Sequence, residues 1–293
     1  MKLGLYKIMA WAGVAMLAVA LFAGCKKQDD QDLIPAYIQI DTIKLNAGQQ
    51  QGGPYHKITD AWIFVDNQPL GCFELPCKIP VLKSGKHNIL VGGGIKINGI
   101  GASRIPYPFY QFYAIDSVNL VKTQTVTLNP VVSYFSGIQF PYLEDFSSGS
   151  TSFIDVPEGD TGLVRLNAGA DLLDGACGAF IMPPGINTAQ AYTTSNLLLP
   201  GGGDNVYLEF NFKSNHTLFA GLYVNNPNEV VVNQIIGLNP SPDNWNKVYV
   251  NLTPEVSSAI NAGSFRLFFR VIKSGEDTLK DVRILLDNIK IVN

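Results

Sequence analysis

The chain has 293 residues, a net charge of −3 at pH 7, 46% hydrophobic residues and 15% charged residues. This balance excludes a disordered chain, and the slightly acidic charge without a basic patch argues against nucleic acid as a partner. The sequence contains 28 Gly and 17 Pro together with 12 Tyr and 16 Phe, which favours many strands joined by tight turns. Its length suits one large domain or two ordinary domains.

The start of the chain has the pattern of a secretory signal. Lys2 and Lys7 precede an apolar run over residues 8–24, which ends in small residues before Cys25. A basic leader, a hydrophobic segment and small residues before a cleavage point are typical of such signals. An uncleaved membrane anchor is the alternative, because the apolar run approaches the length of a membrane-spanning helix.

The residues around Cys25 resemble the lipobox of bacterial lipoproteins. The tetrapeptide Phe22-Ala23-Gly24-Cys25 carries the resemblance, with Leu21 one place upstream of the usual leucine. In that family the signal is cut before the cysteine, which then carries a lipid such as palmitate. The resemblance implies that residues 1–24 are a signal peptide and that lipid on Cys25 attaches the mature chain to a membrane.

Residues 25–35 form a charged, solvated tether that begins Cys-Lys-Lys-Gln-Asp-Asp-Gln-Asp. This run resembles the signal that sends Bacteroidetes lipoproteins to the outer face of the outer membrane. The resemblance implies an outer-membrane lipoprotein exposed at the cell surface. A protein that faces the periplasm is the alternative.

Residues 36–135 are predicted to form a first β-sandwich. Alternating or continuous apolar runs predict strands over residues 37–45, 61–65, 79–82, 88–91, 117–121 and 123–128. The turn between residues 82 and 88 favours a hairpin of the two strands beside it. The segments Val65–Gly71, Leu75-Pro76 and Ile79–Ile89 resemble PEGA-type modules, which are small immunoglobulin-like sandwiches of bacterial surface proteins. The stretch that continues to Phe109 resembles an uncharacterised group of Bacteroidetes lipoproteins, which implies a fold and a location but no activity.

Residues 136–293 are predicted to form a second β-sandwich. Strict alternation over residues 206–212, 247–252 and 265–271 is typical of half-buried antiparallel sheet. The strand Tyr142–Phe146 and the terminal run Leu286–Ile291 resemble the first and last strands of jelly-roll carbohydrate-binding modules. The predicted fold class is therefore all-β, with an immunoglobulin-like sandwich followed by a jelly roll.

The second sandwich contains candidate glycan-binding residues. Sugar rings stack on flat aromatic side chains while nearby polar groups bind their hydroxyls. Alternation places several aromatic and basic residues away from the aliphatic rows, namely Tyr207, Trp245, Lys247, Tyr249, Arg266, Phe268 and Arg270. The alternative is that these aromatic residues only stabilise an exposed sheet face or lie beneath a loop.

A second candidate surface lies near the domain boundary. Five aromatic residues occur between two prolines and the next strand, namely Tyr107, Phe109, Tyr110, Phe112 and Tyr113. Rigid and exposed, they would dock a protein partner. The alternative is that they cover the open end of the first sandwich or pack against the second domain.

Metal and disulfide sites are also suggested by the sequence. Glu144, Asp145 and Asp287 lie on the expected first and last strands of the jelly roll, and carboxylate oxygens suit a structural calcium ion. Cys72 and Cys77 follow a signal to an oxidising compartment, where a small-loop disulfide forms readily. Two unbonded cysteines that serve as small core residues are an equal alternative.

Enzyme signatures are missing from the sequence. The three histidines, His56, His87 and His216, lie far apart and in no metal-ligand spacing. No Gly-x-Ser-x-Gly elbow occurs, and the Gly-rich runs lack the Lys-Ser/Thr of a phosphate loop. The predicted function is therefore non-catalytic binding by a surface lipoprotein, with glycan as the leading ligand and no cofactor apart from calcium. The alternative is a structural or adhesive envelope subunit that docks a protein partner.

Overall fold

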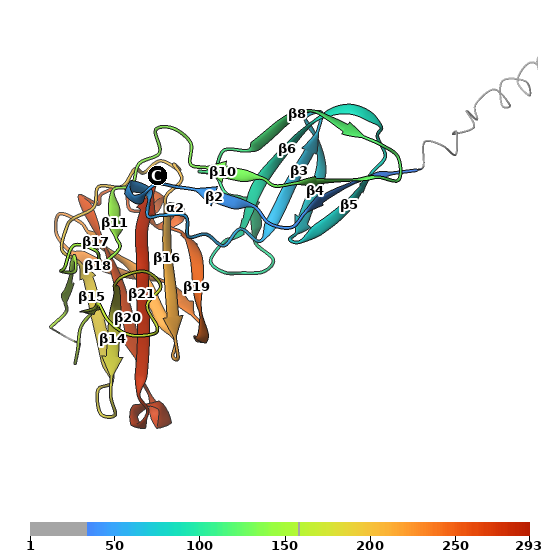
Figure 1. Ribbon diagram of the computed structural model, residues 1–293. Helices are drawn as coiled ribbons and strands as arrows, with labels where there is room; N and C mark the ends of the chain where they lie inside the picture. Colours follow the sequence, from blue (N-terminus) through green and yellow to red (C-terminus); the bar gives the residue numbers. More distant parts are fainter. Residues whose placement is uncertain (1–33, 158) are drawn as a thin grey trace, which may run out of the picture.

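The computed structural model of the protein describes residues 34–157 and 159–293. The predicted signal peptide, Cys25 and nearly all of the tether lie outside the described residues. The all-β prediction is confirmed, because the described chain consists of strands with one short α-helix and two 3-10 turns. These strands build two sandwiches set at an angle to each other (Figure 1). Within the described part, no helix has the length and apolar character needed to cross a bilayer.

The first sandwich contains the strands between residues 36 and 133. Its elements are β1 (Ala36–Ile40), β2 (Lys44–Asn46), η2 (Gln49–Gln51), β3 (Asp60–Val65), β4 (Gln68–Glu74), β5 (Cys77–Val81), β6 (Gly85–Lys96), β7 (Arg104–Pro106), β8 (Tyr113–Leu120), β9 (Thr125–Leu128) and β10 (Val131–Ser133). One sheet has the order β5-β1-β9, and the other has the order β4-β3-β6-β7 with β8 also paired to β6. Alternate residues of each sheet, such as Ile38 and Ile63, are fully buried between the two layers.

The predicted hairpin over residues 79–91 is wrong. β5 pairs with β1 in one sheet, whereas β6 pairs with β3 and β8 in the other. The turn before β6 therefore carries the chain from one layer of the sandwich to the other. A turn signal in the sequence marks a reversal of direction, but it does not show whether the next strand pairs with the previous one or crosses the core.

The second sandwich begins at residue 142. Its elements are β11 (Tyr142–Glu144), β12 (Phe153–Asp155), β13 (Val164–Leu166), β14 (Cys177–Met182), β15 (Thr188–Thr193), β16 (Tyr207–Ser214), β17 (Leu218–Asn225), β18 (Val230–Leu238), β19 (Ser241–Asn251), α2 (Thr253–Ser258), β20 (Ser264–Ile272), η3 (Gly275–Leu279) and β21 (Val282–Val292). One sheet has the order β13-β14-β21-β16-β19, with β11 also on β21, and the other has the order β12-β15-β20-β17-β18. The aromatic rings of Phe210 and Phe269 meet between the layers at 5.0 Å. This is the two-sheet jelly roll that the sequence predicts.

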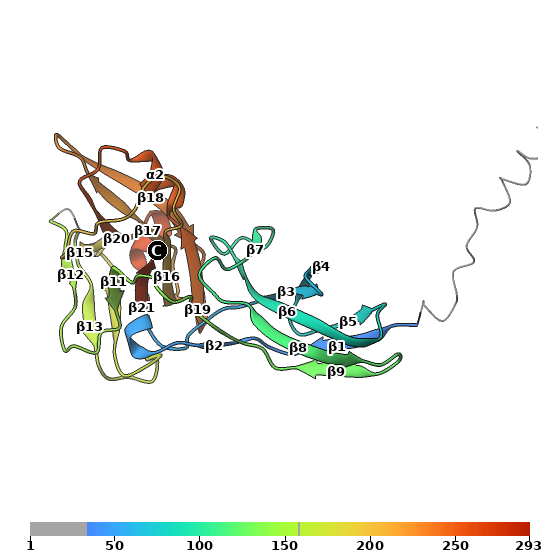
Figure 2. The same ribbon diagram turned by 90° about the horizontal axis from the view of Figure 1, so that it is seen from above.

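The two sandwiches share a continuous core where they meet. Tyr207, Tyr249 and Val292 of the second sandwich belong to the buried cluster of the first. Asn98 in the loop after β6 donates its backbone N–H to the Tyr249 carbonyl at 2.8 Å. The C-terminus lies at this junction, whereas the described chain begins at the far end of the first sandwich (Figures 1 and 2). The second sandwich is therefore the part of the molecule most distant from the start of the described chain.

Candidate functional site

A cleft of about 490 Å³ lies on the open face of the sheet formed by β12, β15, β20, β17 and β18. Its size falls within the range of small-ligand sites, roughly 300–1,000 Å³. Valines and a proline form part of its wall, and the polar and aromatic residues of the lining are Gln190, Tyr192, Tyr223, Asn225, Arg266 and Arg270.

The alternation of β20 places the basic residues in the cleft. Every second residue from Phe265 to Val271 is buried in the core between the two sheets. Because successive side chains of a strand point to opposite faces, the residues between them lie on the open face. Arg266 and Arg270 therefore project into the cleft, with Phe268 between them.

The neighbouring strands supply the two tyrosines. On β15, Tyr192 is in register with Phe268, and Gln190 is in register with Arg270. On β17, Tyr223 is in register with Arg266. Three strands that are separate in the sequence thus bring the aromatic and polar side chains together on one face.

The aromatic side chains of the cleft are held by mutual contacts. The rings of Tyr192 and Tyr223 lie 5.5 Å apart at 61°, and Tyr223 lies 5.2 Å from the fully buried Phe268 ring at 65°. Arg266 is 5.0 Å above the Tyr192 ring, and Arg270 is 5.2 Å above the Phe268 ring. These distances are those of favourable edge-to-face and cation–π contacts, so the two half-buried tyrosine rings have a defined position.

Hydrogen bonds fix the polar side chains in the same way. The Gln190 amide donates to the Tyr223 hydroxyl, and its carbonyl oxygen accepts from Nε of Arg270. Nε of Arg266 donates to Oδ1 of Asn196 at 2.8 Å. Each arginine thus uses its inner nitrogen to bind the protein, and its terminal nitrogens have no acceptor among the described residues. A cleft built in this way presents flat rings and fixed hydrogen-bond donors without an ordering cost on binding.

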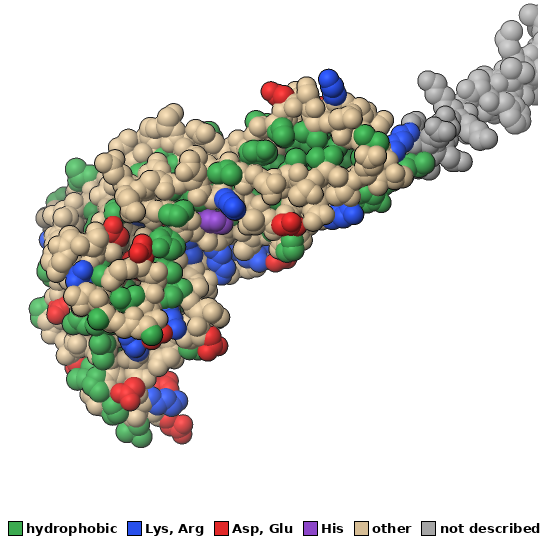
Figure 3. Space-filling view, in the orientation of Figure 1, with side chains coloured by type: hydrophobic (Ala, Val, Ile, Leu, Met, Phe, Trp, Pro, Cys, Tyr) green, Lys and Arg blue, Asp and Glu red, His purple; other side chains and the backbone are tan. Residues whose placement is uncertain are grey.

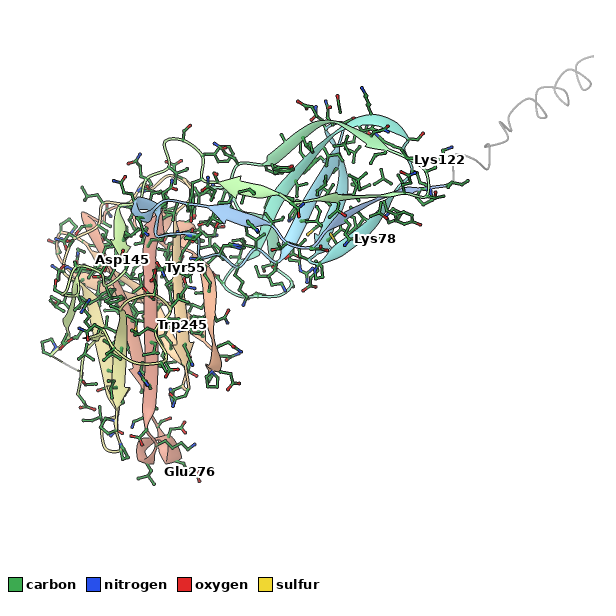
Figure 4. All side chains as sticks on the ribbon, in the orientation of Figure 1. Tyr55, Lys78, Lys122, Asp145, Trp245 and Glu276 are labelled. Atoms are coloured by element: carbon green, nitrogen blue, oxygen red, sulfur yellow. The ribbon has the colours of Figure 1, made fainter. Side chains whose placement is uncertain are left out.

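The predicted glycan platform of the second sandwich is wrong for most of its members. Tyr207 and Tyr249 are each only 2% exposed, because the first sandwich covers this end of β16 and β19. Lys247 is buried beside them. Trp245 lies on the opposite sheet from the cleft, half-buried, with its Nε1–H donated to the Asp171 carbonyl at 2.8 Å (Figure 4).

Three of the predicted residues do lie at the cleft. Arg266 and Arg270 line it, whereas Phe268 is covered by its neighbours and forms the floor beneath Tyr223. Tyr192 and Tyr223 are not among the residues predicted from the sequence. Tyr192 alternates with small buried residues in β15. Such a strand shows its period clearly, but the sequence does not show that it lies beside β20.

The predicted partner-docking residues are mostly buried at the domain junction. Tyr107, Phe109 and Tyr110 are at most 4% exposed and pack against the second sandwich. They are therefore part of the interface, as the alternative interpretation has it, and are not a surface for another protein. Phe112 remains 37% exposed and Tyr113 is half-buried, because both lie beyond the edge of the contact.

A buried charge cluster crosses the junction. Glu209 is completely buried, and its Oε1 accepts hydrogen bonds from the hydroxyls of Tyr107 at 2.8 Å and Tyr134 at 2.9 Å. Its Oε2 lies 3.0 Å from Nζ of Lys247 and 3.5 Å from Nζ of Lys290. Both tyrosines come from the first sandwich and both lysines from the second, so one carboxylate ties the two together.

The pKa of Glu209 reflects the balance of burial and charge. Burial alone would raise it, but the positive charges of Lys290 and Lys247 and the Tyr107 hydrogen bond lower it to about 2. Burial also lowers the pKa of Lys290 to about 8, although the Glu209 charge opposes this shift. At neutral pH the cluster therefore holds an ionised carboxylate, which we call the junction carboxylate.

A second cavity, of about 450 Å³, lies beside the junction and contains acidic residues. Asp145, Asp174 and Asp287 line it together with Tyr55, whose hydroxyl donates to Oδ2 of Asp174 at 3.1 Å. Figure 4 shows Tyr55 and Asp145 at the end of the second sandwich that adjoins the first. Surface charges of both signs are scattered over this side of the second sandwich (Figure 3), and the cavity lining itself contains Arg165 beside the three aspartates.

The predicted calcium ligands do not form one group in this structure. β11 and β21 are neighbours, as expected, and bring Asp145 and Asp287 to the same cavity. Glu144, however, uses both of its oxygens to accept from the backbone of Phe146 and from Ser152. Within residues 34–157 and 159–293, no three His, Cys, Asp or Glu side chains are grouped to hold a metal ion. The structural calcium ion stays a prediction.

Asp287 makes the stability of the protein depend on pH. Its side chain is 1% exposed, and burial together with the charges of Asp174, Asp145 and Glu144 raises its pKa to about 8, although a backbone hydrogen bond from Asn288 opposes the shift. The folded state therefore keeps a proton that the unfolded chain has lost between about pH 4 and pH 8. Stability from this group falls as the pH rises through that window.

We expect Asp287→Asn to raise the unfolding temperature at pH 8 and to flatten its dependence on pH between 5 and 8. The amide keeps the shape of the side chain and an oxygen that accepts from the Asn288 backbone, but it carries no charge to bury. The expected gain in the free energy of unfolding at pH 8 is a few kcal/mol, because each unit of pKa shift corresponds to about 1.4 kcal/mol. Thermal unfolding at four pH values measures it, with the exposed Asp243→Asn as the matched control. A variant whose curve runs parallel to the wild type contradicts the prediction.

The predicted disulfide is not formed. Cys72 and Cys77 are free, as is the buried Cys177. Cys72 lies on β4 and pairs with Trp62 of β3, whereas Cys77 lies on β5 and pairs with Ile40 of β1. The two cysteines thus belong to opposite sheets of the sandwich, and the short sequence separation does not bring their side chains together.

Comparison with known proteins finds similarity at the level of structure. No protein-family model matches this sequence, and no curated protein matches it significantly. A family 22 xylan-binding domain from Paenibacillus barcinonensis is 10% identical, with 51% of this chain and 97% of that chain covered at a TM-score of 0.40. The tandem pair of such domains from the same protein is 11% identical, with 80% of this chain and 73% of that chain covered at a TM-score of 0.41.

A third similar structure is a family 11 carbohydrate-binding module from Clostridium thermocellum in complex with a mixed-linked tetrasaccharide. It is 11% identical, with 51% of this chain and 93% of that chain covered at a TM-score of 0.35. These three similar structures are carbohydrate-binding modules. Identities and TM-scores of this size do not define a ligand for this chain, which depends on the residues of its own cleft.

Proposed function

We propose that the protein is a non-catalytic module that binds a glycan in the cleft of the second sandwich. The observation that carries this proposal is the meeting of Tyr192 and Tyr223 with the fixed polar groups of Gln190, Arg266 and Arg270 in one open cleft. The apolar face of a sugar ring packs on the tyrosine rings, and the amide and guanidinium groups bind its hydroxyls.

The composition of the cleft supports binding without catalysis. Most glycoside hydrolysis uses two carboxylates at a fixed separation. The described residues that line this cleft include no Asp or Glu. The acidic residues of the second cavity belong to the other sheet and its loops, away from this cleft.

We also propose that lipid on Cys25 anchors the protein in the outer membrane with the cleft facing outward. The lipobox-like sequence and the charged tether support this location. Incorporation of labelled palmitate into the wild type but not into Cys25→Ser is the expected result. Equal labelling of both proteins, or of neither, contradicts the proposal.

The glycan proposal is tested by retention of the purified full-length protein on a panel of immobilised polysaccharides. We expect the wild type to be retained, and we expect Tyr192→Ala and Tyr223→Ala each to lose tenfold or more in affinity. Stacking on one aromatic ring contributes on the order of 1–3 kcal/mol. Trp245→Ala is the matched control, because it removes a half-buried aromatic ring from the opposite sheet. Loss of retention in Trp245→Ala alone, or no retention of the wild type, would overturn the proposal.

A further inference from the structure

We infer that the cleft selects an acidic glycan, a chain whose sugars carry carboxylate or sulfate groups. This inference rests on the glycan-binding role proposed above and adds the chemical class of the ligand. Its basis is the pair of arginines, Arg266 and Arg270, and what surrounds them.

Like Arg165, and unlike Arg104 and Arg283, the two cleft arginines have no acidic partner among the residues that the structure describes. Arg104 pairs with Asp60 at 2.9 Å, and Arg283 pairs with Asp171 at 3.2 Å. In the described part of the chain, neither Arg266 nor Arg270 has a carboxylate within 4.0 Å. Two positive charges thus remain uncompensated in a cleft with apolar walls, where their field is stronger than at a flat surface.

The geometry of each guanidinium leaves its outer edge for a ligand. Nε of Arg266 donates to Asn196 and Nε of Arg270 donates to Gln190, so each side chain is held from the inside. The terminal nitrogens have no acceptor among the residues that the structure describes. Two parallel N–H groups of this kind match the two oxygens of a carboxylate or sulfate, which is the strongest hydrogen-bond arrangement available to arginine.

The guanidinium groups of both arginines lie over aromatic rings of the cleft. Arg266 and Arg270 are four residues apart on one face of β20, and their guanidinium groups lie over the rings of Tyr192 and Phe268, which are in register with each other. A polymer that contacts the aromatic rings therefore meets both positive charges in the same part of the cleft.

The overall charge of the protein does not favour a polyanion. The chain carries a net charge of −3, and the described lining of the cleft contains no acid. Glu158, which follows Pro157 in the sequence, lies outside the described residues. Binding of an acidic polymer would therefore depend on this cleft and not on the overall charge of the protein.

The experiment compares polymers that differ only in charge. Affinity electrophoresis of the full-length protein uses polygalacturonate beside the same polymer with its carboxylates reduced to alcohols, and dextran sulfate beside dextran. We expect at least tenfold tighter binding to the charged member of one pair, and the pair that shows it identifies carboxylate or sulfate. In Arg266→Gln/Arg270→Gln this preference is expected to disappear, whereas the control Arg283→Gln keeps it.

Each other outcome overturns the inference in a distinct way. Equal or tighter binding to the uncharged polymers overturns the acidic ligand but leaves the glycan proposal standing. Binding to neither member of either pair, together with no retention on the neutral panel, overturns both. A preference that Arg283→Gln loses as strongly as the double variant shows attraction by general surface charge. The comparison of polymers uses the wild type alone, so it decides the ligand class even where a variant folds poorly.

Discussion

Replacing the junction carboxylate by an amide, in Glu209→Gln, is expected to lower the stability of the protein by about 3–5 kcal/mol. Glu209 and Lys290 are fully buried and Lys247 nearly so. The carboxylate compensates both lysine charges, at 3.0 Å and 3.5 Å. The amide still accepts from the tyrosine hydroxyls, but it leaves two positive charges in a dry interface. For a chain of this size the loss corresponds to about 10 °C in unfolding temperature.

Differential scanning calorimetry measures this effect, with Glu276→Gln as the control. Glu276 lies exposed at the tip of the second sandwich that is farthest from the junction (Figure 4). The lowered pKa of Glu209 means that its contribution is present at neutral pH and is lost only as the pH falls from about 4 towards 2, so the measurement belongs at pH 7. An unfolding temperature within 2 °C of the wild type would sink the prediction.

A triple variant separates charge from packing at the same place. In Glu209→Leu/Lys247→Met/Lys290→Met all three charged groups are replaced by apolar side chains of similar volume. We expect most of the stability lost in Glu209→Gln to return, because a buried ion pair and a well-packed apolar cluster are often close in free energy. Destabilisation of the triple variant as large as that of the single variant would instead mean that the hydrogen bonds from Tyr107 and Tyr134 hold the junction.

Gly221→Ala is expected to destabilise the second sandwich by about 2–3 kcal/mol and to weaken glycan binding. Gly221 lies at an irregularity in the pairing of β17 with β18. A methyl group there would overlap the carbonyl oxygen of Asn233 and lie 2.7 Å from the ring of Phe268. Phe268 forms the floor beneath Tyr223. Relief of the clash displaces Phe268 and with it Tyr223, the ring on which the glycan proposal depends.

The control for this prediction is Gly263→Ala, at the start of β20. Its nearest neighbour would be the Asn225 carbonyl oxygen at 3.7 Å, an ordinary contact. We expect Gly263→Ala to leave both the unfolding temperature and polysaccharide retention close to the wild type. If Gly221→Ala also leaves both unchanged, the floor of the cleft is more adaptable than the structure indicates, and this prediction is wrong.

The fold class was predictable from the sequence because buried and exposed residues alternate along a strand that packs on a core. The alternation from Phe265 to Val271 correctly separates the core of the second sandwich from its open face. Alternation does not show whether the outer face of a strand is open to solvent or covered by another part of the protein. Tyr249 and Arg266 both alternate with core residues, yet one lies under the first sandwich and the other lines the cleft.

The candidate site was only partly predictable for the same reason. It depends on the order β15-β20-β17, in which strands that are distant in the sequence become neighbours. Tyr192 and Tyr223 are 31 positions apart in the numbering and meet only because β20 lies between their strands. The junction carboxylate shows this limit of sequence-based prediction most clearly. In the sequence Glu209 alternates with core residues like any outward-facing strand residue, and only the structure shows that the first sandwich covers it.

The parallel pairing of β1 with β9 has a mechanical consequence. Four residue pairs, from Tyr37–Thr125 to Ile40–Leu128, join the two strands, and β2 pairs with β10 in the same parallel sense. The chain enters β1 at its N-terminal end and leaves β9 for the second sandwich at its C-terminal end. With the anchor at Cys25 as proposed, tension on a held polymer slides these strands past each other along their length. All the hydrogen bonds of the ladder then resist together, whereas a hairpin pulled from its open end loses them one at a time. The first sandwich is thus connected so that a force between the proposed membrane anchor and the glycan-binding cleft loads its parallel strands in shear.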